Sequence, residues 1–251
     1  YVRFAKSRAL DSPIPERMTI FLTNQCNMKC AHCFIVKEHQ PRLAEMTLED
    51  YRKLFASLGG NVSQALFTGG EPTLRKDFAD IVVAASREGG IATANVFSNA
   101  LNGEHLTSLF EDILGRCTIN LNFQTSIDGT EAFHDANRRV PGALAHVRDS
   151  IERVKALQRR HPGRFVRIVA TTVVSRHNLD ILEDICDLVL ETGVVPAFAF
   201  VRTANDVSDL ADRGLLSDFA PEEFKSDGSP KFQDKAYRDA SAMDEAPRRS
   251  N

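Results

Sequence analysis

The stretch TINLNFQTSIDG, from Thr118 to Gly129, alternates between apolar and polar side chains. One set holds Ile119, Leu121, Phe123 and Ile127, and the other holds Thr118, Asn120, Asn122, Gln124, Ser126 and Asp128. A period of two predicts a strand whose two faces meet different surroundings. A parallel strand covered by helices on both faces would be almost entirely apolar. The pattern therefore favours a strand with one face toward a wet or ligand-filled lumen.

Similar strand segments flank this one, and helical segments separate them. Strands are expected at residues 18–23, 64–70, 91–99, 164–174 and 194–202, and helices at 47–58, 77–88, 104–114, 143–159 and 179–191. Six β–α steps predict a parallel sheet with right-handed crossovers. An open doubly wound sheet would share this element order. The polar face of residues 118–129 favours instead an α/β partial (β/α)6 TIM-like barrel of parallel strands with helices outside.

Three cysteines crowd the loop that follows the first expected strand, in LTNQCNMKCAHCFI (residues 22–35). Cys26, Cys30 and Cys33 have the spacing C-x-x-x-C-x-x-C. A closed structural zinc site takes four ligands, whereas three thiolates can hold three corners of a [4Fe–4S] cubane and leave one iron open. The alternative is a zinc site with three cysteines and either His32 or His39, although no second ligand pair exists elsewhere in the chain.

Three motifs together resemble the radical S-adenosylmethionine superfamily. They are the cysteine spacing, TGGEP (residues 68–72) after the second expected strand, and SIDGTEAFHDANR (residues 126–138) after the fourth. The last is similar to the S-x-D-G-x-x-x-x-H-D-x-x-R pattern of the peptide- and sulfatase-maturing branch. The resemblance covers residues 18–202. It implies that Cys26, Cys30 and Cys33 hold a [4Fe–4S] cluster, at which S-adenosylmethionine is reductively cleaved to a 5′-deoxyadenosyl radical that abstracts hydrogen from a substrate.

The resemblance also implies roles for residues around the cofactor. Gly69 and Gly70 let the backbone approach a ligand closely, and their carbonyls and Glu71 would accept hydrogen bonds from the cofactor's ammonium group. Ser126 would contact the ribose hydroxyls. Arg138 would pair with the methionine carboxylate, a task that suits a planar guanidinium.

Other residues near the expected strand ends are further candidates for this site. His32 stands where the family usually has an aromatic residue near the adenine, and Asn99 and Arg202 follow the third and sixth strands as lumen candidates. Arg139 is the alternative carboxylate partner to Arg138. Asp128 is interpreted as a turn former with no catalytic role.

Composition limits the class of protein. With 251 residues and 43% hydrophobic content, one large domain is expected. A net charge of -3 and a pI of about 6.2 argue against a nucleic-acid partner. No apolar run approaches the roughly 20 residues that span a bilayer. No signal peptide follows Tyr1, and clustered, odd-numbered cysteines favour the cytoplasm.

Boundaries follow from shifts in composition along the chain. Residues 1–17 are expected to be a lead-in segment, 18–202 the barrel core, and 203–251 a partly flexible extension. The extension holds no cysteine, so the auxiliary clusters found in many relatives of this branch are lacking or belong to a module missing from this chain. Cys117 and Cys186 are predicted to be buried small hydrophobes.

The resemblance favours a peptide or protein side chain as the substrate. The alternatives are the same radical chemistry on a small molecule, such as a sugar or an amino acid, and a metal-binding regulatory module without turnover. An electron donor such as flavodoxin or ferredoxin is the expected protein partner, because reductive cleavage consumes an electron.

Overall fold

The computed structural model describes residues 16–33, 44–175 and 177–200, and the statements below refer to these residues. They form one six-stranded sheet in which every neighbouring pair is parallel. The strands are β1 (Arg17–Phe21), β2 (Gln64–Thr68), β3 (Thr93–Phe97), β4 (Asn120–Ser126), β5 (Phe165–Val174) and β6 (Val195–Phe200). Their spatial order equals their chain order and the sheet does not close, with β1 and β6 at its two edges. The predicted partial barrel is therefore confirmed, because a doubly wound sheet reverses its strand order at a switch point.

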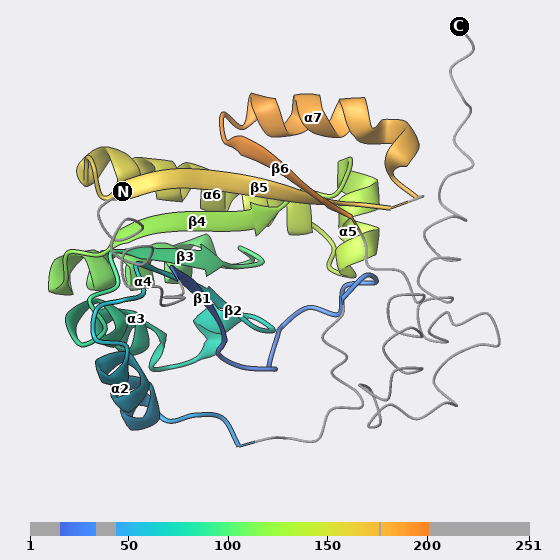
Figure 1. The fold of residues 1–251 in the computed structure, drawn as a ribbon. Coiled ribbons are helices and arrows are strands. Elements are labelled where there is room, and N and C mark those ends of the chain that lie inside the picture. Colours follow the sequence, from blue (N-terminus) through green and yellow to red (C-terminus); the bar gives the residue numbers. More distant parts are fainter. Residues whose placement is uncertain (1–15, 34–43, 176, 201–251) are drawn as a thin grey trace, which may run out of the picture.

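Helices cover the outside of the curved sheet (Figure 1). They are α2 (Leu48–Ser57), α3 (Phe78–Arg87), α4 (Gly103–Arg116), α5 (Glu131–Arg138), α6 (Ala143–Arg160) and α7 (Leu182–Glu191), with short 3-10 turns η1 (Pro72–Leu74) and η2 (Leu179–Ile181). The predicted helices are present within a few residues of their expected bounds. Thr47 and Asp50 close a capping box at the start of α2. The helix α5 was not predicted.

The alternation along β4 separates the core from the inner face of the sheet. Leu121 and Phe123 are fully buried, whereas Asn122 and Gln124 are half-buried on the other face. Phe110 of α4 packs edge-on against Phe123 with ring centroids 5.9 Å apart. Full burial of such a side chain contributes about 1.5–3 kcal/mol. The apolar set thus fixes which face of the sheet the helices cover, and the polar set is left to line the inner face.

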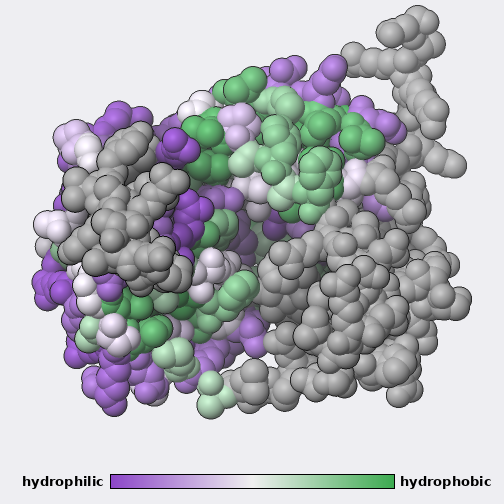
Figure 2. Space-filling view, viewed as in Figure 1, coloured by the Kyte–Doolittle hydropathy of each residue, from purple (hydrophilic) through white to green (hydrophobic). Residues whose placement is uncertain are grey.

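The sixth strand is less covered than the others. Phe198 is 47% exposed and Phe200 is 81% exposed, and Figure 2 shows apolar side chains gathered over α7 and β6. The chain continues beyond Phe200 into residues 201–251, which lie outside the described part, as do residues 1–15 of the predicted lead-in. Within the lead-in, Arg17 already belongs to β1. The remaining domain boundaries stay predictions.

The predicted burial of Cys117 and Cys186 is wrong, because both side chains are only half-buried. Cys117 ends α4 as its C-cap, three residues before β4 begins, so the alternation of the strand does not apply to it. Its thiol lies 3.3 Å from the carbonyl oxygen of Ile113. No described helix combines the length and the apolar character that crossing a bilayer requires.

Candidate active site

The predicted site residues that lie in the described segments gather at the carboxyl edge of the sheet. The cysteine loop (residues 22–33) follows β1, Gly69–Glu71 follows β2, Asn99 follows β3, and Ser126 ends β4. Parallel strands place their carboxyl ends at one edge, where active sites of such folds lie. In Figure 1 the strand arrows point toward the side on which α5 and the cysteine loop lie.

Backbone hydrogen bonds fasten the cysteine loop to the turn after β2. Gly70 N donates to Thr23 O at 2.7 Å, and Glu71 N donates to Gln25 O at 2.7 Å. A Cβ atom on Gly69 would lie 2.4 Å from Thr23 O, and one on Gly70 would lie 2.2 Å from Gln25 O. Both distances are shorter than any real Cβ contact. The two glycines are thus required by the packing of the loop itself, and their contact with the cofactor stays a prediction.

Glu71 is 2% exposed and joins the ends of two strands. One carboxylate oxygen accepts from the hydroxyl (2.6 Å) and the backbone N–H (3.2 Å) of Thr73, and the other accepts from Asn99 N at 2.7 Å. Burial raises the pKa of Glu71, and these hydrogen bonds offset part of that rise. Through its contact with the backbone N–H of Thr73, Glu71 is the N-cap of η1. The contact with an ammonium group stays a prediction.

The three loop cysteines are half-buried, and none of the five cysteines, all of which lie in described segments, forms a disulfide. Asn99 Nδ2 lies 3.8 Å from Cys26 Sγ and donates to Asn27 Oδ1 at 2.7 Å. Asn99 was predicted to be a lumen candidate; the structure brings it to the cysteine loop, and its contact with the cofactor stays a prediction. Arg138 reaches the same loop from α5, with Nη1 3.7 Å from Cys30 Sγ.

Three thiols in one loop are the type of donor set that an iron–sulfur cluster takes. In segments 16–33, 44–175 and 177–200, no three His, Cys, Asp or Glu side chains converge closely enough to hold one metal ion. A cubane spaces its cysteine sulfurs more widely, because each binds a different iron. Of the two histidines considered for zinc, His32 turns its Nδ1 to the Asn137 amide, whose nitrogen lies 3.0 Å away. The other, His39, lies outside the described residues.

Arg138, the last residue of α5, is buried and ion-paired. It is 7% exposed, and its Nε donates to Asp128 Oδ2 at 2.7 Å. Its Nη2 lies 2.7 Å from the same oxygen, although its N–H groups are not aimed along a hydrogen bond. The neighbouring Arg139 is exposed in a left-handed conformation with φ 55°. The arrangement favours Arg138 over Arg139 as a site residue, and its pairing with a cofactor carboxylate stays a prediction.

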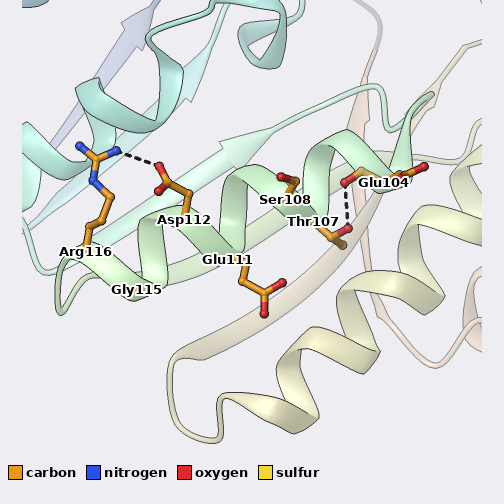
Figure 3. Close-up of a pocket in the computed structure, with 7 residues that line it drawn as sticks. All are labelled: Glu104, Thr107, Ser108, Glu111, Asp112, Gly115 and Arg116. Atoms are coloured by element: carbon orange, nitrogen blue, oxygen red, sulfur yellow. Dashed lines mark hydrogen bonds and ion pairs between the residues drawn. The ribbon is translucent and has the colours of Figure 1, made fainter.

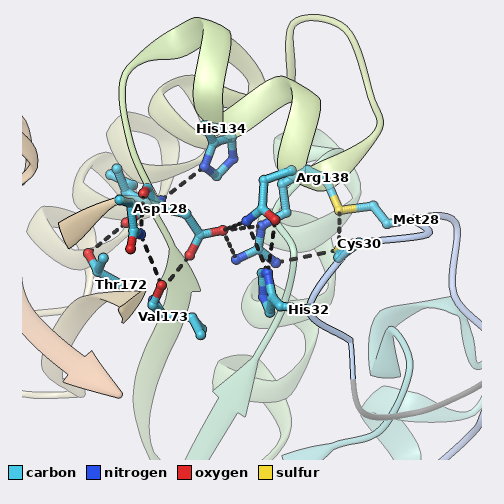
Figure 4. Close-up of polar contacts among 11 residues, drawn as sticks. Met28, Cys30, His32, Asp128, His134, Arg138, Thr172 and Val173 are labelled. Carbon is cyan, nitrogen blue, oxygen red and sulfur yellow. Dashed lines mark hydrogen bonds and ion pairs between the residues drawn. The ribbon is translucent and has the colours of Figure 1, made fainter. Parts of the chain in front are cut away.

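Asp128 is the centre of a buried polar network that sequence reasoning missed (Figure 4). Its side chain is 0% exposed. Besides Arg138, it accepts from Asn137 Nδ2 at 3.0 Å and from the backbone N–H of Val173 in β5 at 3.2 Å. Burial alone would raise the pKa of Asp128, but the charge of Arg138 brings it below its usual value. At neutral pH the network therefore contains a charged pair.

Three more residues of this network were not singled out from the sequence. Asn137 accepts from Ala31 N through its backbone carbonyl at 2.8 Å, which ties α5 to the cysteine loop. His134 Nδ1 accepts from Asp128 N at 3.1 Å. Asn178 Nδ2 donates to Asp128 O at 2.9 Å. The signal for His134 and Asn137 was the clustering of Asp, His, Asn and Arg within residues 126–138, whereas Asn178 lies outside that segment.

The remaining predicted residues differ in what the structure says of them. Ser126 is half-buried at the carboxyl end of β4, on the inner face and opposite Thr171 of β5. Gln124 Nε2 on that face donates to Thr171 Oγ1 at 2.6 Å. Arg202 lies outside the described residues. Ser126 thus lies on the inner face at the end of β4, and its contact with ribose stays a prediction.

A separate surface hollow of about 610 Å³ runs along α4 (Figure 3). Its lining residues are Glu104, Thr107, Ser108, Glu111, Asp112, Gly115 and Arg116. Arg116 bonds to Asp112 within the hollow and to Asp80 of α3, so its charge is already compensated. None of the predicted site residues that the structure describes lines this hollow.

Comparisons with known proteins agree on one family. Residues 20–189 match the family described as the Radical SAM superfamily. The chain is 30% identical over 195 residues to the sporulation killing factor maturation protein SkfB of Bacillus subtilis (strain 168), which is 77% of this chain and 43% of SkfB. It is 30% identical over 199 residues to the GTP 3′,8-cyclase of Aquifex aeolicus (strain VF5), which is 76% of this chain and 58% of that enzyme.

A solved structure has a similar fold. Streptococcus suis SuiB bound to precursor peptide SuiA superposes with a TM-score of 0.55 at 17% identity, over 85% of this chain and 48% of SuiB. At this identity the likeness concerns the fold alone. The chain spans about half the length of the relatives that it matches.

Proposed function

The chain belongs to the radical SAM superfamily, and from this we propose that it is an enzyme that uses a [4Fe–4S] cluster and S-adenosylmethionine to remove a hydrogen atom from a peptide substrate. The cluster would be held by Cys26, Cys30 and Cys33. When bound, the two cofactors together supply a carbon radical strong enough for an unactivated C–H bond, along with 5′-deoxyadenosine as the by-product.

The observation that carries the proposal is the position of the cysteine loop. Its cysteines lie at the carboxyl edge of the sheet, between the turn that carries Glu71 and the helix that carries Arg138. A buried carboxylate on one side and a buried guanidinium on the other suit an amino acid moiety, which has an ammonium and a carboxylate of its own. The chain thus supplies complementary charges beside the iron ligands.

A peptide substrate is supported by the inner face of the sheet and by the relatives. The inner face presents side-chain amides and hydroxyls, which can pair with peptide groups. Asn122 donates to Asn95 Oδ1 at 2.7 Å, and its own Oδ1 is buried with no hydrogen-bond partner among the described residues. SkfB is named a maturation protein, and SuiB was solved with a precursor peptide. The runner-up is a small molecule, which the likeness to the GTP 3′,8-cyclase favours.

A reducing environment and an electron source complete the proposal. The cluster would take its electron from a small protein donor such as flavodoxin or ferredoxin. Thiolate ligands stay available under the reducing conditions of the cytoplasm, so we propose that location.

The cofactor part is tested by anaerobic reconstitution with iron and sulfide, followed by metal and sulfide analysis. We expect about four iron and four sulfide ions per chain, as a [4Fe–4S] cluster requires. The combined Cys26→Ala, Cys30→Ala and Cys33→Ala variant should hold none. The matched control, Cys117→Ala with Cys186→Ala, should hold the full amount. One zinc ion and no sulfide per chain would contradict the proposal.

The substrate part is tested by supplying candidates to the loaded enzyme with S-adenosylmethionine and dithionite. Short peptides encoded beside its gene are compared with GTP, and 5′-deoxyadenosine and the mass of each candidate are measured. A peptide whose mass changes only when the three cysteines are present supports peptide maturation. If GTP increases the formation of 5′-deoxyadenosine and no peptide does, the small-molecule alternative is favoured.

A further inference from the structure

The carboxylate of Asp128 is buried between the end of β4, the helix α5 and strand β5. It is 0% exposed and receives the Arg138 guanidinium, the Asn137 amide and the Val173 backbone N–H. A charged group of this kind is stable in the interior only when it is paired and hydrogen-bonded. Asp128 therefore needs Arg138, and Arg138 in turn needs Asp128.

The same guanidinium faces a cysteine of the loop. Arg138 Nη1 lies 3.7 Å from Cys30 Sγ, while Nε and Nη2 lie 2.7 Å from Asp128 Oδ2. The guanidinium thus lies between the thiol and the carboxylate. Figure 4 shows Arg138 reaching toward Asp128 on one side and toward Cys30 on the other.

We propose that Asp128 is a positioning residue that holds the guanidinium of Arg138 against Cys30 and compensates its charge, so that the pair sets the reduction potential of the cluster. This inference rests on the proposed function, since it needs a cluster bound through Cys30. It concerns how easily the cluster takes an electron, which the cofactor's identity alone does not fix, because charge and hydrogen bonds around the sulfurs shift Fe–S potentials widely.

Loss of Asp128 and loss of Arg138 should shift the reduction potential of the cluster in opposite directions. Reduction adds one negative charge, so an uncompensated cation beside Cys30 favours the reduced cluster and raises the potential. Removal of the cation disfavours the reduced cluster and lowers the potential. At this depth the interaction of two charges is little screened by water or salt. Because Asp128 carries the opposite charge, its removal should shift the potential upward.

The test is a potentiometric titration of the reconstituted cluster, monitored by electron paramagnetic resonance. It is performed without S-adenosylmethionine, so that no cofactor carboxylate takes the place of Asp128. Asp128→Asn should shift the midpoint to more positive values, and Arg138→Gln to more negative values. Each shift should change the ratio of reduced to oxidised cluster about tenfold at fixed potential, which is 59 mV for a one-electron couple. The double variant should lie between the two.

Controls separate this electrostatic role from a structural one. Arg139→Gln removes the adjacent, exposed arginine and should leave the midpoint unchanged. Should Asp128→Asn fail to hold a cluster, the sign of the Arg138→Gln shift decides the matter alone. A midpoint that does not move in cluster-loaded Arg138→Gln, or that moves upward, overturns the inference. A wild-type chain that binds no cluster would instead refute the proposed function.

Discussion

The cysteine loop is held on two sides, and the two sides use different forces. On the β2 side, Gly70 and Glu71 bind the loop through backbone hydrogen bonds, and the absence of a Cβ allows the approach. On the α5 side, Asn137 and Arg138 reach the loop chiefly with side chains, and Asp128 anchors them.

Because the forces differ, the contacts on the two sides should be sensitive to different substitutions. Contacts made by the backbone are insensitive to charge and sensitive to side-chain size. Contacts made by a buried ion pair tolerate little change in charge, because an unpaired buried charge is strongly unfavourable. Substitutions on the two sides should therefore leave different signatures in stability, cluster content and cofactor binding.

The largest effect on stability is expected from Asp128→Ala. It leaves the buried guanidinium of Arg138 without its partner, which destabilises a fold by about 3–5 kcal/mol. The measurement is the free energy of unfolding in urea. The matched control is Asp149→Ala, which breaks an exposed pair with Arg153 on α6 and should cost no more than about 0.5 kcal/mol. Equal costs for the two variants would refute the idea that α5 is held by a buried charge.

Arg138→Ala should weaken binding of S-adenosylmethionine while the cluster remains. A charge-assisted pair that is partly removed from water contributes roughly 1.5–3 kcal/mol, or about a 10- to 150-fold change in the dissociation constant. Arg138→Lys should recover only part of the loss, since an ammonium cannot bind both carboxylate oxygens as a fork. Arg139→Ala should do little. If Arg139→Ala abolishes binding and Arg138→Ala does not, the assignment is displaced by one residue.

On the β2 side, Gly70→Ala should lower the iron content of the reconstituted chain while the fold stays intact. Its Cβ would lie 2.2 Å from Gln25 O, so the loop must move away from the turn. Overpacking of this kind destabilises a fold by about 1–3 kcal/mol. Iron per chain after reconstitution is the direct measurement. Gly115→Ala is the matched control, because a Cβ there meets no atom within 4 Å. An unchanged iron content in Gly70→Ala would show that the loop does not need this contact.

The smallest effect concerns pH and His134. Burial, with the nearby charge of Arg138, lowers the pKa of His134 to about 4. His134 therefore binds a proton more readily in the unfolded chain than in the folded one. The free energy of unfolding is highest above about pH 6.5 and decreases as the pH falls toward 4. Between pH 7 and pH 5 the loss should be about 1–2 kcal/mol. Melting temperatures at the two pH values should differ less in His134→Asn than in wild type, whereas His146→Asn, which changes an exposed side chain of α6, should behave like wild type.

The fold was largely predictable because apolar side chains report on burial. The alternation in β4 indicated which face packs against helices, and the same logic located the other strands and most helices. Helix α5 escaped because its buried residues are polar: His134, Asn137 and Arg138. A search for apolar periodicity detects no helix of that kind.

The position of the candidate site could be predicted from the sequence, whereas the contacts that support it could not. Three cysteines in one loop and two glycines before Glu71 are local signals. Asp128 was interpreted as a turn former because the sequence does not reveal that Val173, Asn178 and Arg138 converge on it. The half-burial of Cys186 likewise depends on how much of α7 other elements cover, which its helical periodicity does not reveal.

The two attachments of the cysteine loop also differ in when they can form. The β2 turn follows the loop by about forty residues, whereas Asn137 and Arg138 lie 105 residues beyond His32 and 108 beyond Cys30. Contacts of such long sequence separation close late in folding. During synthesis the loop can meet Gly70 early, but it stays open toward the α5 side until residue 138 has been made. While residues 71–138 are being made, the cysteine loop can thus have its contacts on the β2 side and none yet on the α5 side.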